Sequence, residues 1–161
     1  MKRIVVGIDG SDESRGAALF AADLAAALGA RLSLVTVIPA EERPTGPDGL
    51  VQFRARWLEK ERDRAEAFLQ QVAAACERPG LRVETDVYEG APAITLADAA
   101  LSPEIEMVVV GDRGRNAMSH KVLGGAADTL LKSAVARLLL GSVADRLMQI
   151  SPKPVLVYRG A

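Results

Sequence analysis

Short apolar runs alternate along the chain with longer stretches in which apolar residues recur every three or four positions. A short, near-continuous apolar run is typical of a strand covered on both faces, and the longer periodic stretches are typical of amphipathic helices. Predicted strands of this kind lie at residues 3–8, 31–37, 105–111 and 154–159, and residues 81–90, where apolar and polar residues alternate, are predicted as a further strand. Strands separated by helices need crossover connections, so the pattern predicts an α/β protein with one five-stranded, doubly wound parallel sheet and helices on both faces.

The helical stretches carry their own start and stop signals. Ser11 can cap a helix with an acidic first turn, and Gly29 is a natural end for that helix. A second, long and charged helix has one apolar stripe, which consists of Leu58, Ala65, Leu69, Val72 and Cys76. We therefore interpret Cys76 as core packing rather than as a reactive thiol. A third helix is expected at residues 91–101, where Pro92 is tolerated in the first turn.

Composition narrows the classes of function. With 161 residues the chain is expected to form a single domain over residues 1–161, and its formal net charge of −1 gives no electrostatic footprint for nucleic acid. The amino-terminal apolar run, residues 4–6, is too short for a secretion signal or a membrane span. One cysteine and one histidine exclude an intrachain disulfide and two-histidine metal sites. We expect a cytoplasmic protein without a membrane partner.

The candidate chemistry lies where strands end. Ligands of doubly wound sheets bind outside the carboxyl ends of the strands, and glycine-rich turns follow the first and fourth predicted strands, at Asp9-Gly10-Ser11 and at residues 111–114. The chain has no GxxxxGK[ST] and no GxGxxG after its first strand. It does have Gly141-Ser142 opening a helix, where free amide groups and the helix dipole favour an anion. Ser142 serving only as a helix cap is the alternative.

These elements together resemble the universal stress protein family. The likeness covers essentially the whole chain and is carried by GIDGS after the first strand, the late VVVGDRGR, and LLLGSVADRLMQISPKPVLVYR at the carboxyl end. The resemblance implies a Rossmann-like sheet with strand order 3-2-1-4-5. One branch of the family binds ATP through the pattern G-x2-G-x9-G-[S/T], and we identify the chain as similar to that branch.

The spacing departs from that pattern. Nine residues separate Gly114 from Gly124, as the pattern requires, but Gly124 is followed by Gly125 instead of Ser or Thr. Gly141 is followed by Ser142, but 26 residues separate it from Gly114, which is seventeen more than the nine of the pattern. VLGGAADTLL, which starts at Val122, matches LLGSVADRLM, which starts at Leu139, at Leu, Gly, Ala, Asp and Leu. We interpret this as a tandem duplication that leaves a helical insertion at about residues 120–136, with chance similarity of two amphipathic helices as the alternative.

The position of the last helix favours Gly141-Ser142 as the family site. If Gly124 held the site, one helix would run for about 40 Å and would overshoot the sheet. The insertion then has three possible roles: a lid over the nucleotide, a plug in its site, or a contact with another chain.

The resemblance also implies roles for individual residues. Asp9 would contact the ribose or adenine end, although a turn residue bonding its own backbone is the alternative. Val37 would offer backbone hydrogen bonds to adenine. The base pocket would be lined by Ile8 and Val110. The phosphates would be surrounded by Gly111, Gly114, Gly141, Ser142 and the amide of Val143.

Charged residues near the turn add further candidates from their chemistry. Arg113 and Arg115 are cations beside a phosphate turn. Asp112 weakens this positive charge and is alternatively a ligand for Mg²⁺ between phosphate oxygens. His120 falls in the insertion and is interpreted as a solvated or packing residue.

The leading hypothesis is a regulatory, ATP-binding stress-response domain, with Mg²⁺ accompanying the nucleotide. Its rival is a nucleotide-free, homodimeric interaction protein whose insertion occludes the site. An enzyme comes third, because the sequence offers no activated nucleophile and no paired carboxylates, so any ATP hydrolysis is expected to be slow. Pairing through the last strand, with Val155 and Val157 on one face, is expected to form a homodimer.

Overall fold

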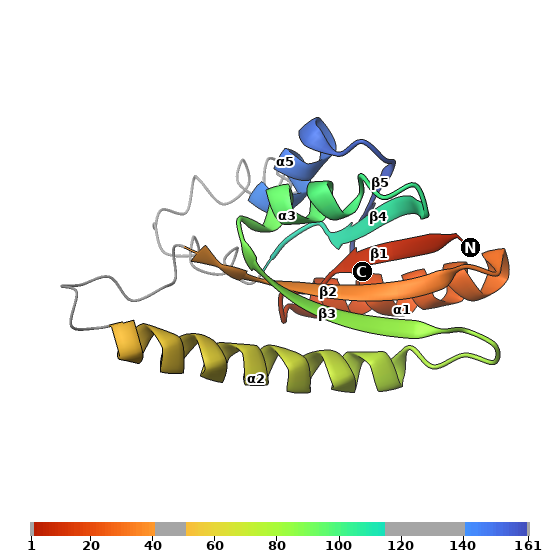
Figure 1. Cartoon of the computed structure of the whole chain (residues 1–161). Coiled ribbons are helices and arrows are strands. Elements are labelled where there is room, and N and C mark those ends of the chain that lie inside the picture. Colours follow the sequence, from red (N-terminus) through yellow and green to blue (C-terminus); the bar gives the residue numbers. More distant parts are fainter. Residues whose placement is uncertain (1, 41–50, 115–140, 161) are drawn as a thin grey trace, which may run out of the picture.

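The computed structural model describes residues 2–40, 51–114 and 141–160. Helices and strands alternate along these segments (Figure 1). The elements are β1 (Arg3–Gly7), α1 (Asp12–Leu28), β2 (Arg31–Pro39), α2 (Val51–Ala75), β3 (Val83–Gly90), α3 (Pro92–Ala99), β4 (Ile105–Gly111), α5 (Ser142–Ile150) and β5 (Val155–Tyr158).

The five strands form one parallel sheet in the order β3-β2-β1-β4-β5. The chain starts in the middle of the sheet at β1, winds outward through β2 and β3, and then returns to the other side of β1 for β4 and β5. The strand order therefore reverses between β1 and β4. The predicted fold class and strand order are confirmed.

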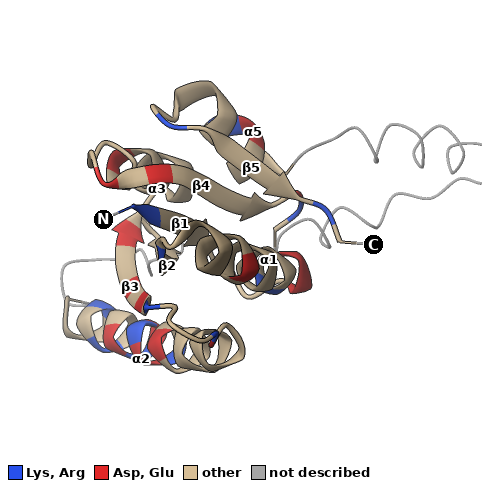
Figure 2. Ribbon diagram, turned by 90° about the vertical axis from the view of Figure 1, so that its right-hand side faces the viewer, with Lys and Arg blue, Asp and Glu red and all other residues tan. Residues whose placement is uncertain are grey.

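One face of the sheet is covered by α1 and α2 (Figures 1 and 2). The buried side of α1 consists almost wholly of alanine: Ala17, Ala18, Ala21, Ala22 and Ala25. Because alanine side chains are small, the helix backbone can lie close to the strands. At Gly16 the helix packs against the ring of Tyr158 on β5, since an added Cβ would lie 2.5 Å from that ring. The predicted helix boundaries are confirmed: Ser11 caps α1, and Gly29 ends it with a φ of 61°.

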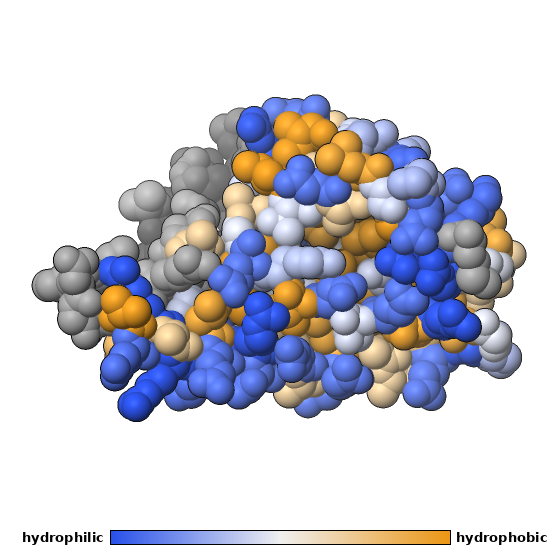
Figure 3. Space-filling model, in the orientation of Figure 1, coloured by the Kyte–Doolittle hydropathy of each residue, from blue (hydrophilic) through white to orange (hydrophobic). Residues whose placement is uncertain are grey.

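The long helix α2 contacts the sheet with only part of its length. Leu69 and Val72 are its buried residues, and Cys76, directly after its end, is also buried. Positive and negative residues are interspersed along α2 (Figure 2), and the lower side of the molecule in Figure 3 is largely hydrophilic. The core role predicted for Cys76 is confirmed, and burial raises the pKa of its thiol.

The opposite face is covered by the two short helices α3 and α5 (Figure 1). Leu96 of α3 and Leu147 of α5 are fully packed, together with Val108 of β4. Ile94 of α3 and Met148 of α5 are exposed apolar side chains, and apolar residues gather over the top of the molecule in Figure 3. Because both helices are short, they leave the starts of β1, β2 and β3 uncovered on this face.

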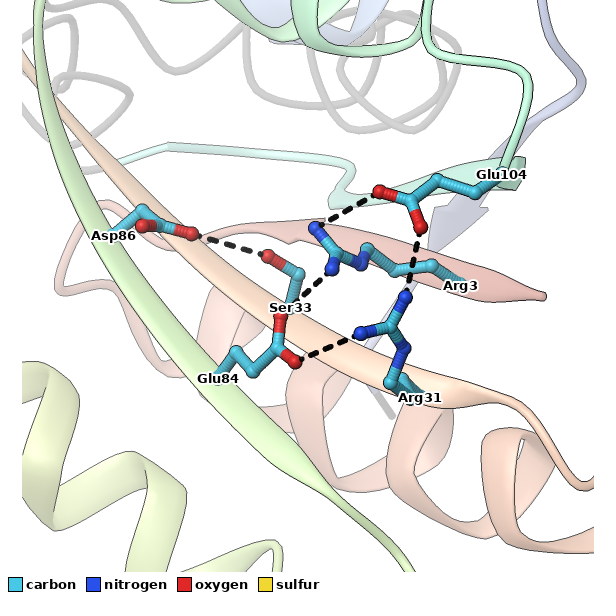
Figure 4. A network of polar contacts seen from close by, with 6 residues as sticks. All are labelled: Arg3, Arg31, Ser33, Glu84, Asp86 and Glu104. Atoms are coloured by element: carbon cyan, nitrogen blue, oxygen red, sulfur yellow. Dashed lines mark hydrogen bonds and ion pairs between the residues drawn. The ribbon is translucent and has the colours of Figure 1, made fainter. Parts of the chain in front are cut away.

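The uncovered part carries a ring of four charged side chains (Figure 4). The guanidinium of Arg3 pairs with Glu84 at 2.9 Å and with Glu104 at 3.5 Å, and that of Arg31 pairs with the same two carboxylates at 3.2 and 2.7 Å. These residues come from β1, β2, β3 and the residue preceding β4. The ring therefore connects the amino-terminal ends of four neighbouring strands.

Some element ends differ from the sequence-based expectation. β2 runs to Pro39 rather than to residue 37, because β3 continues to pair with it as far as Pro39↔Gly90. α3 ends at Ala99, earlier than predicted, and Ala100 closes it with a right-handed conformation. Within the described residues, none of the helices has the length and apolarity that crossing a membrane requires.

Candidate functional site

The turn after β1 meets the start of α1. Oδ1 of Asp9 accepts hydrogen bonds from the backbone N–H of Ser11 at 3.0 Å and from its hydroxyl at 2.6 Å. The Ser11 hydroxyl oxygen accepts from the N–H of Ser14 at 3.1 Å and so caps α1. Gly10 has a φ of 87°, which favours glycine. The turn interpretation of Asp9 is thus observed, and the exposed Asp9 also lies at the carboxyl edge of the sheet.

Two glycines let the turn after β4 approach α1 and the turn after β1. A Cβ on Gly111 would lie 2.9 Å from Cβ of Glu13 and 3.2 Å from the N of Ser14. A Cβ on Gly114 would lie 2.6 Å from Oδ2 of Asp9. Gly111 is therefore needed for packing against the first turn of α1. Gly114 brings the later turn directly against the Asp9 carboxylate.

The start of α5 joins the same edge. Gly141 donates its N–H to the carbonyl of Asp112 at 2.5 Å, and a Cβ on Gly141 would lie 3.3 Å from Cα of Arg113. Gly141 is the N-cap of α5, and within the described residues no side chain caps this helix. The next N–H with a helical partner is that of Asp145, which bonds Gly141. The amides of Ser142 and Val143 therefore stand at an uncapped helix start, and the cap alternative for Ser142 is not observed.

The structure describes one of the two glycine pairs of the proposed duplication, Gly141-Ser142, and shows that a helix begins there. Gly141 has φ −59° and ψ 151°, which is not helical, so α5 begins at Ser142 and has nine residues. One continuous helix through this position is excluded. Gly124, Arg115, His120 and residues 120–136 lie outside the described residues.

Beyond the end of β1, the backbone of β2 faces the edge. The pairing of β1 with β2 ends at Gly7↔Val35, followed by the N–H of Ile8, which donates to the Val35 carbonyl at 2.8 Å. In a parallel strand, alternate residues direct their backbone groups to the same side. The N–H and C=O of Val37 thus point toward the β1 side, where β1 has already ended.

The predicted base-lining residues do not share one face of the sheet. Ile8 is 2% exposed and belongs to the core under α1 and α2, whereas Val110 is 4% exposed and belongs to the core under α3 and α5. Val37 and Val143 are partly buried and pack against the second of these cores. The structure therefore brings Val37, Val110 and Val143 together, with Ile8 on the other side.

Asp112 is a buried carboxylate at the centre of this edge. Asp112 is 7% exposed, and its Oδ1 is buried without a hydrogen-bond partner among the residues that the structure describes. Oδ2 lies 3.7 Å from Nε of Arg113 and 3.8 Å from Nε of Arg159. The described residues contain no cluster of three or more potential metal ligands. The neighbours of Asp112 are thus cationic side chains, which do not suit a magnesium ligand.

Arg159 is the residue that the sequence analysis missed. It follows the last residue of β5, and the Tyr158 carbonyl accepts the N–H of Asp112 at 2.8 Å. The available signal was its position: Arg159 ends a strand at the same edge as Gly111. The apolar pattern of this strand had indicated only a surface for pairing.

Comparison with known proteins identifies the family. A model of the universal stress protein family matches residues 1–135. A universal stress protein of Mycolicibacterium smegmatis is 34% identical over 96% of this chain, which spans 52% of that protein, about half its length. One from Thermus aquaticus is 33% identical over 98% of both chains. The chain therefore belongs to the universal stress protein family.

Solved structures share the fold. UspA from Lactobacillus plantarum superposes with a TM-score of 0.75 at 24% identity, covering 98% of this chain and 97% of that one. A universal stress protein solved in complex with cAMP has a TM-score of 0.55 at 25% identity, covering 99% and 98%. One from Archaeoglobus fulgidus in complex with dAMP has a TM-score of 0.62 at 20% identity, covering 98% of each chain.

Proposed function

We propose that this chain binds an adenine nucleotide, ATP, at the carboxyl edge of its sheet, and that it acts as a cytoplasmic regulatory domain of the stress response. One observation carries the proposal: the uncapped start of α5 lies against the glycine turn after β4. Backbone amides at a helix start are an anion site without any charged side chain. Relatives of the same fold that were solved with cAMP and dAMP support an adenine nucleotide as the ligand.

The phosphates are assigned to the amides of Ser142 and Val143 and to the Ser142 hydroxyl. Gly141 contributes through its conformation, because its own N–H already bonds the Asp112 carbonyl. Gly111 and Gly114 contribute by letting two turns approach each other closely. The helix dipole adds a favourable interaction with the negative charge.

The nucleoside is assigned to the position beyond the end of β1, where β2 continues without pairing to β1. The N–H and C=O of Val37 supply the donor and acceptor for the adenine edge. Val110 supplies apolar contact from the same side, while Ile8 supports the turn from the opposite core. Asp9 receives the ribose hydroxyls, in a position fixed by its bonds to Ser11.

Mg²⁺ enters this proposal only as the counter-ion of the nucleotide phosphates. A cation at Asp112 would be repelled by Arg113 and Arg159, which both lie within 4 Å of its Oδ2. No step of the proposed function depends on a protein-bound metal. Any hydrolysis of ATP is expected to be slow.

The rival function, a nucleotide-free homodimeric interaction protein, is favoured by the edge position of β5 at the end of the strand order. Val155 and Val157 pack toward the core under α5, so pairing of two copies would use the β5 backbone. Under this alternative, residues 120–136 would occlude the nucleotide site.

Mass spectrometry of the native chain, purified without added nucleotide, separates the two functions. Retained ATP, or calorimetric binding of Mg·ATP after nucleotide removal, is the result expected from the proposal. A dimer with neither retained nor titratable adenine nucleotide would contradict the proposal and favour the rival.

A further inference from the structure

Asp112 links three segments of the carboxyl edge. Its N–H donates to the Tyr158 carbonyl at the end of β5, and its carbonyl accepts from Gly141 at the start of α5. Its side chain is 10% exposed and faces the guanidinium groups of Arg113 and Arg159. One buried residue thus fixes the spacing between the glycine turn, the last strand and the last helix.

The two arginines contact this carboxylate with only one nitrogen each. In both, Nε lies within 4 Å of Oδ2 of Asp112, at 3.7 Å for Arg113 and 3.8 Å for Arg159. Both side chains are 55% exposed, and neither has another partner in the part of the chain that the structure describes. The terminal nitrogens of both guanidinium groups are therefore available to a ligand.

The charges of this group do not cancel. Two guanidinium cations share a single carboxylate, which leaves one positive charge on this group of three side chains. The terminal nitrogens of arginine form a fork that fits two oxygens of a phosphate group. A buried carboxylate that contacts both Nε atoms restricts the two side chains, so less conformational entropy is lost when an anion binds.

We propose that Arg113 and Arg159, held by Asp112, form a two-arginine clamp for the terminal phosphate of the bound nucleotide. Arg159 is then a phosphate-binding residue from the last strand, and Asp112 is a positioning residue. The inference rests on the proposed function, because Asp112 and Arg113 lie within two residues of Gly114, Arg159 contacts Asp112, and Asp112 is joined to the start of α5 through Gly141. It adds a charged contact to the amides that bind the inner phosphates.

Calorimetry with adenosine, AMP and ATP tests the clamp in the full chain. Arg159→Gln is expected to lower the affinity for ATP about tenfold, the loss of one charge-assisted hydrogen bond, and to leave adenosine affinity within about twofold. Arg159→Lys should recover part of the loss, because it keeps the charge without the fork. Arg82→Gln is the matched control, since Arg82 is exposed, lies before β3, and has a side chain that pairs with none of the described residues.

A double-mutant cycle tests the positioning role of Asp112. In an Asp112→Asn background the arginines are no longer held, so Arg159→Gln should cost less than about threefold in ATP affinity, which is a measurable coupling. A structural role of Asp112 alone would leave the cost of Arg159→Gln unchanged and would contradict this role.

The outcomes separate the clamp from the proposed function. Wild-type affinity for ATP in Arg159→Gln, or an equal loss for adenosine and ATP, would overturn the clamp and leave nucleotide binding standing. A wild-type chain that binds neither adenosine nor ATP would overturn the proposed function and the clamp with it.

Discussion

At the amino-terminal edge of the sheet, charged side chains pair with one another, whereas the carboxyl edge presents backbone amides at an uncapped helix start. Arg3 and Arg31 both contact the carboxylates of Glu84 and Glu104, so that four strand ends are joined by side chains of this chain alone. At the other edge, α5 starts without a side-chain cap, and Arg113 and Arg159 share one carboxylate.

This difference separates stability from function within one sheet. Charges that are already paired and partly buried contribute to holding the strands together, and removing one partner leaves the other without compensation. The uncapped amides of α5, and the arginine nitrogens that Asp112 does not contact, are instead completed by a ligand. Mutations at the amino-terminal edge should therefore change the unfolding free energy, and mutations at the carboxyl edge should change the nucleotide affinity.

The largest effect is expected from Gly114→Val. The new Cβ would lie 2.6 Å from Oδ2 of Asp9 and would displace a carboxylate that Ser11 holds. ATP affinity measured by calorimetry should fall by about 100-fold, as if two charge-assisted hydrogen bonds were lost, with little change in unfolding. Gly160→Val is the matched control, because an added Cβ there meets nothing within 4 Å. Unchanged affinity in Gly114→Val would contradict the site.

Arg31→Met should lower the unfolding free energy rather than the ATP affinity. It removes two ion pairs of the ring, at 3.2 and 2.7 Å, whose carboxylates are 33% and 37% exposed. Urea unfolding should show a loss of about 1 to 3 kcal/mol, reduced from the fully buried case by solvent screening, and ATP affinity should be unchanged. Lys2→Met breaks the exposed pair with Glu106 and should cost no more than about 0.5 kcal/mol. Equal losses for both variants would show that the ring has no special role.

Two serines at helix starts sharpen the comparison. Ser11 caps α1 through its hydroxyl, so Ser11→Ala should lower the unfolding free energy by about 1 kcal/mol. Ser142 makes no cap bond, so Ser142→Ala should change stability by less than about 0.5 kcal/mol and weaken ATP binding about three- to tenfold. A stability loss in Ser142→Ala without any loss of affinity would restore the capping interpretation.

The smallest effect is expected from deleting residues 120–136. The deletion leaves nine residues between Gly114 and Gly141 and so restores the spacing of the family pattern. Because α5 already begins at Ser142, this variant should fold and bind ATP at least as tightly as the wild type. Loss of the folded state in circular dichroism would mean that the segment belongs to the core.

The helices and strands whose apolar residues follow a regular spacing could be predicted from the sequence. Near-continuous or alternating apolar patterns identified the strands, and Ser11 and Gly29 marked both ends of α1, because local hydrogen bonding and backbone conformation determine these features. The end of β2 was predicted two residues early. Its last pairs, to Pro39↔Gly90, depend on a strand more than forty residues later in the chain.

The contacts of the candidate site were harder to foresee. The turn glycines were identified by spacing, but the burial of Asp112 and its contact with Arg159 depend on β4 lying beside β5, which no local pattern reports. The ring at the other edge was missed for the same reason. Arg3, Arg31, Glu84 and Glu104 are far apart in the sequence and meet only because the four strand starts are neighbours.

A two-dimensional ¹H–¹⁵N NMR titration of the labelled chain with Mg·ATP tests the central claim most directly, because it reports on each amide. We predict that the largest shifts fall on Gly114, Ser142 and Val143 at the carboxyl edge, while the amides of Arg31 and Glu84 in the ring stay in place. Shifts concentrated at the amino-terminal edge, or saturation by ATP without any shift at Ser142 and Val143, would contradict the account.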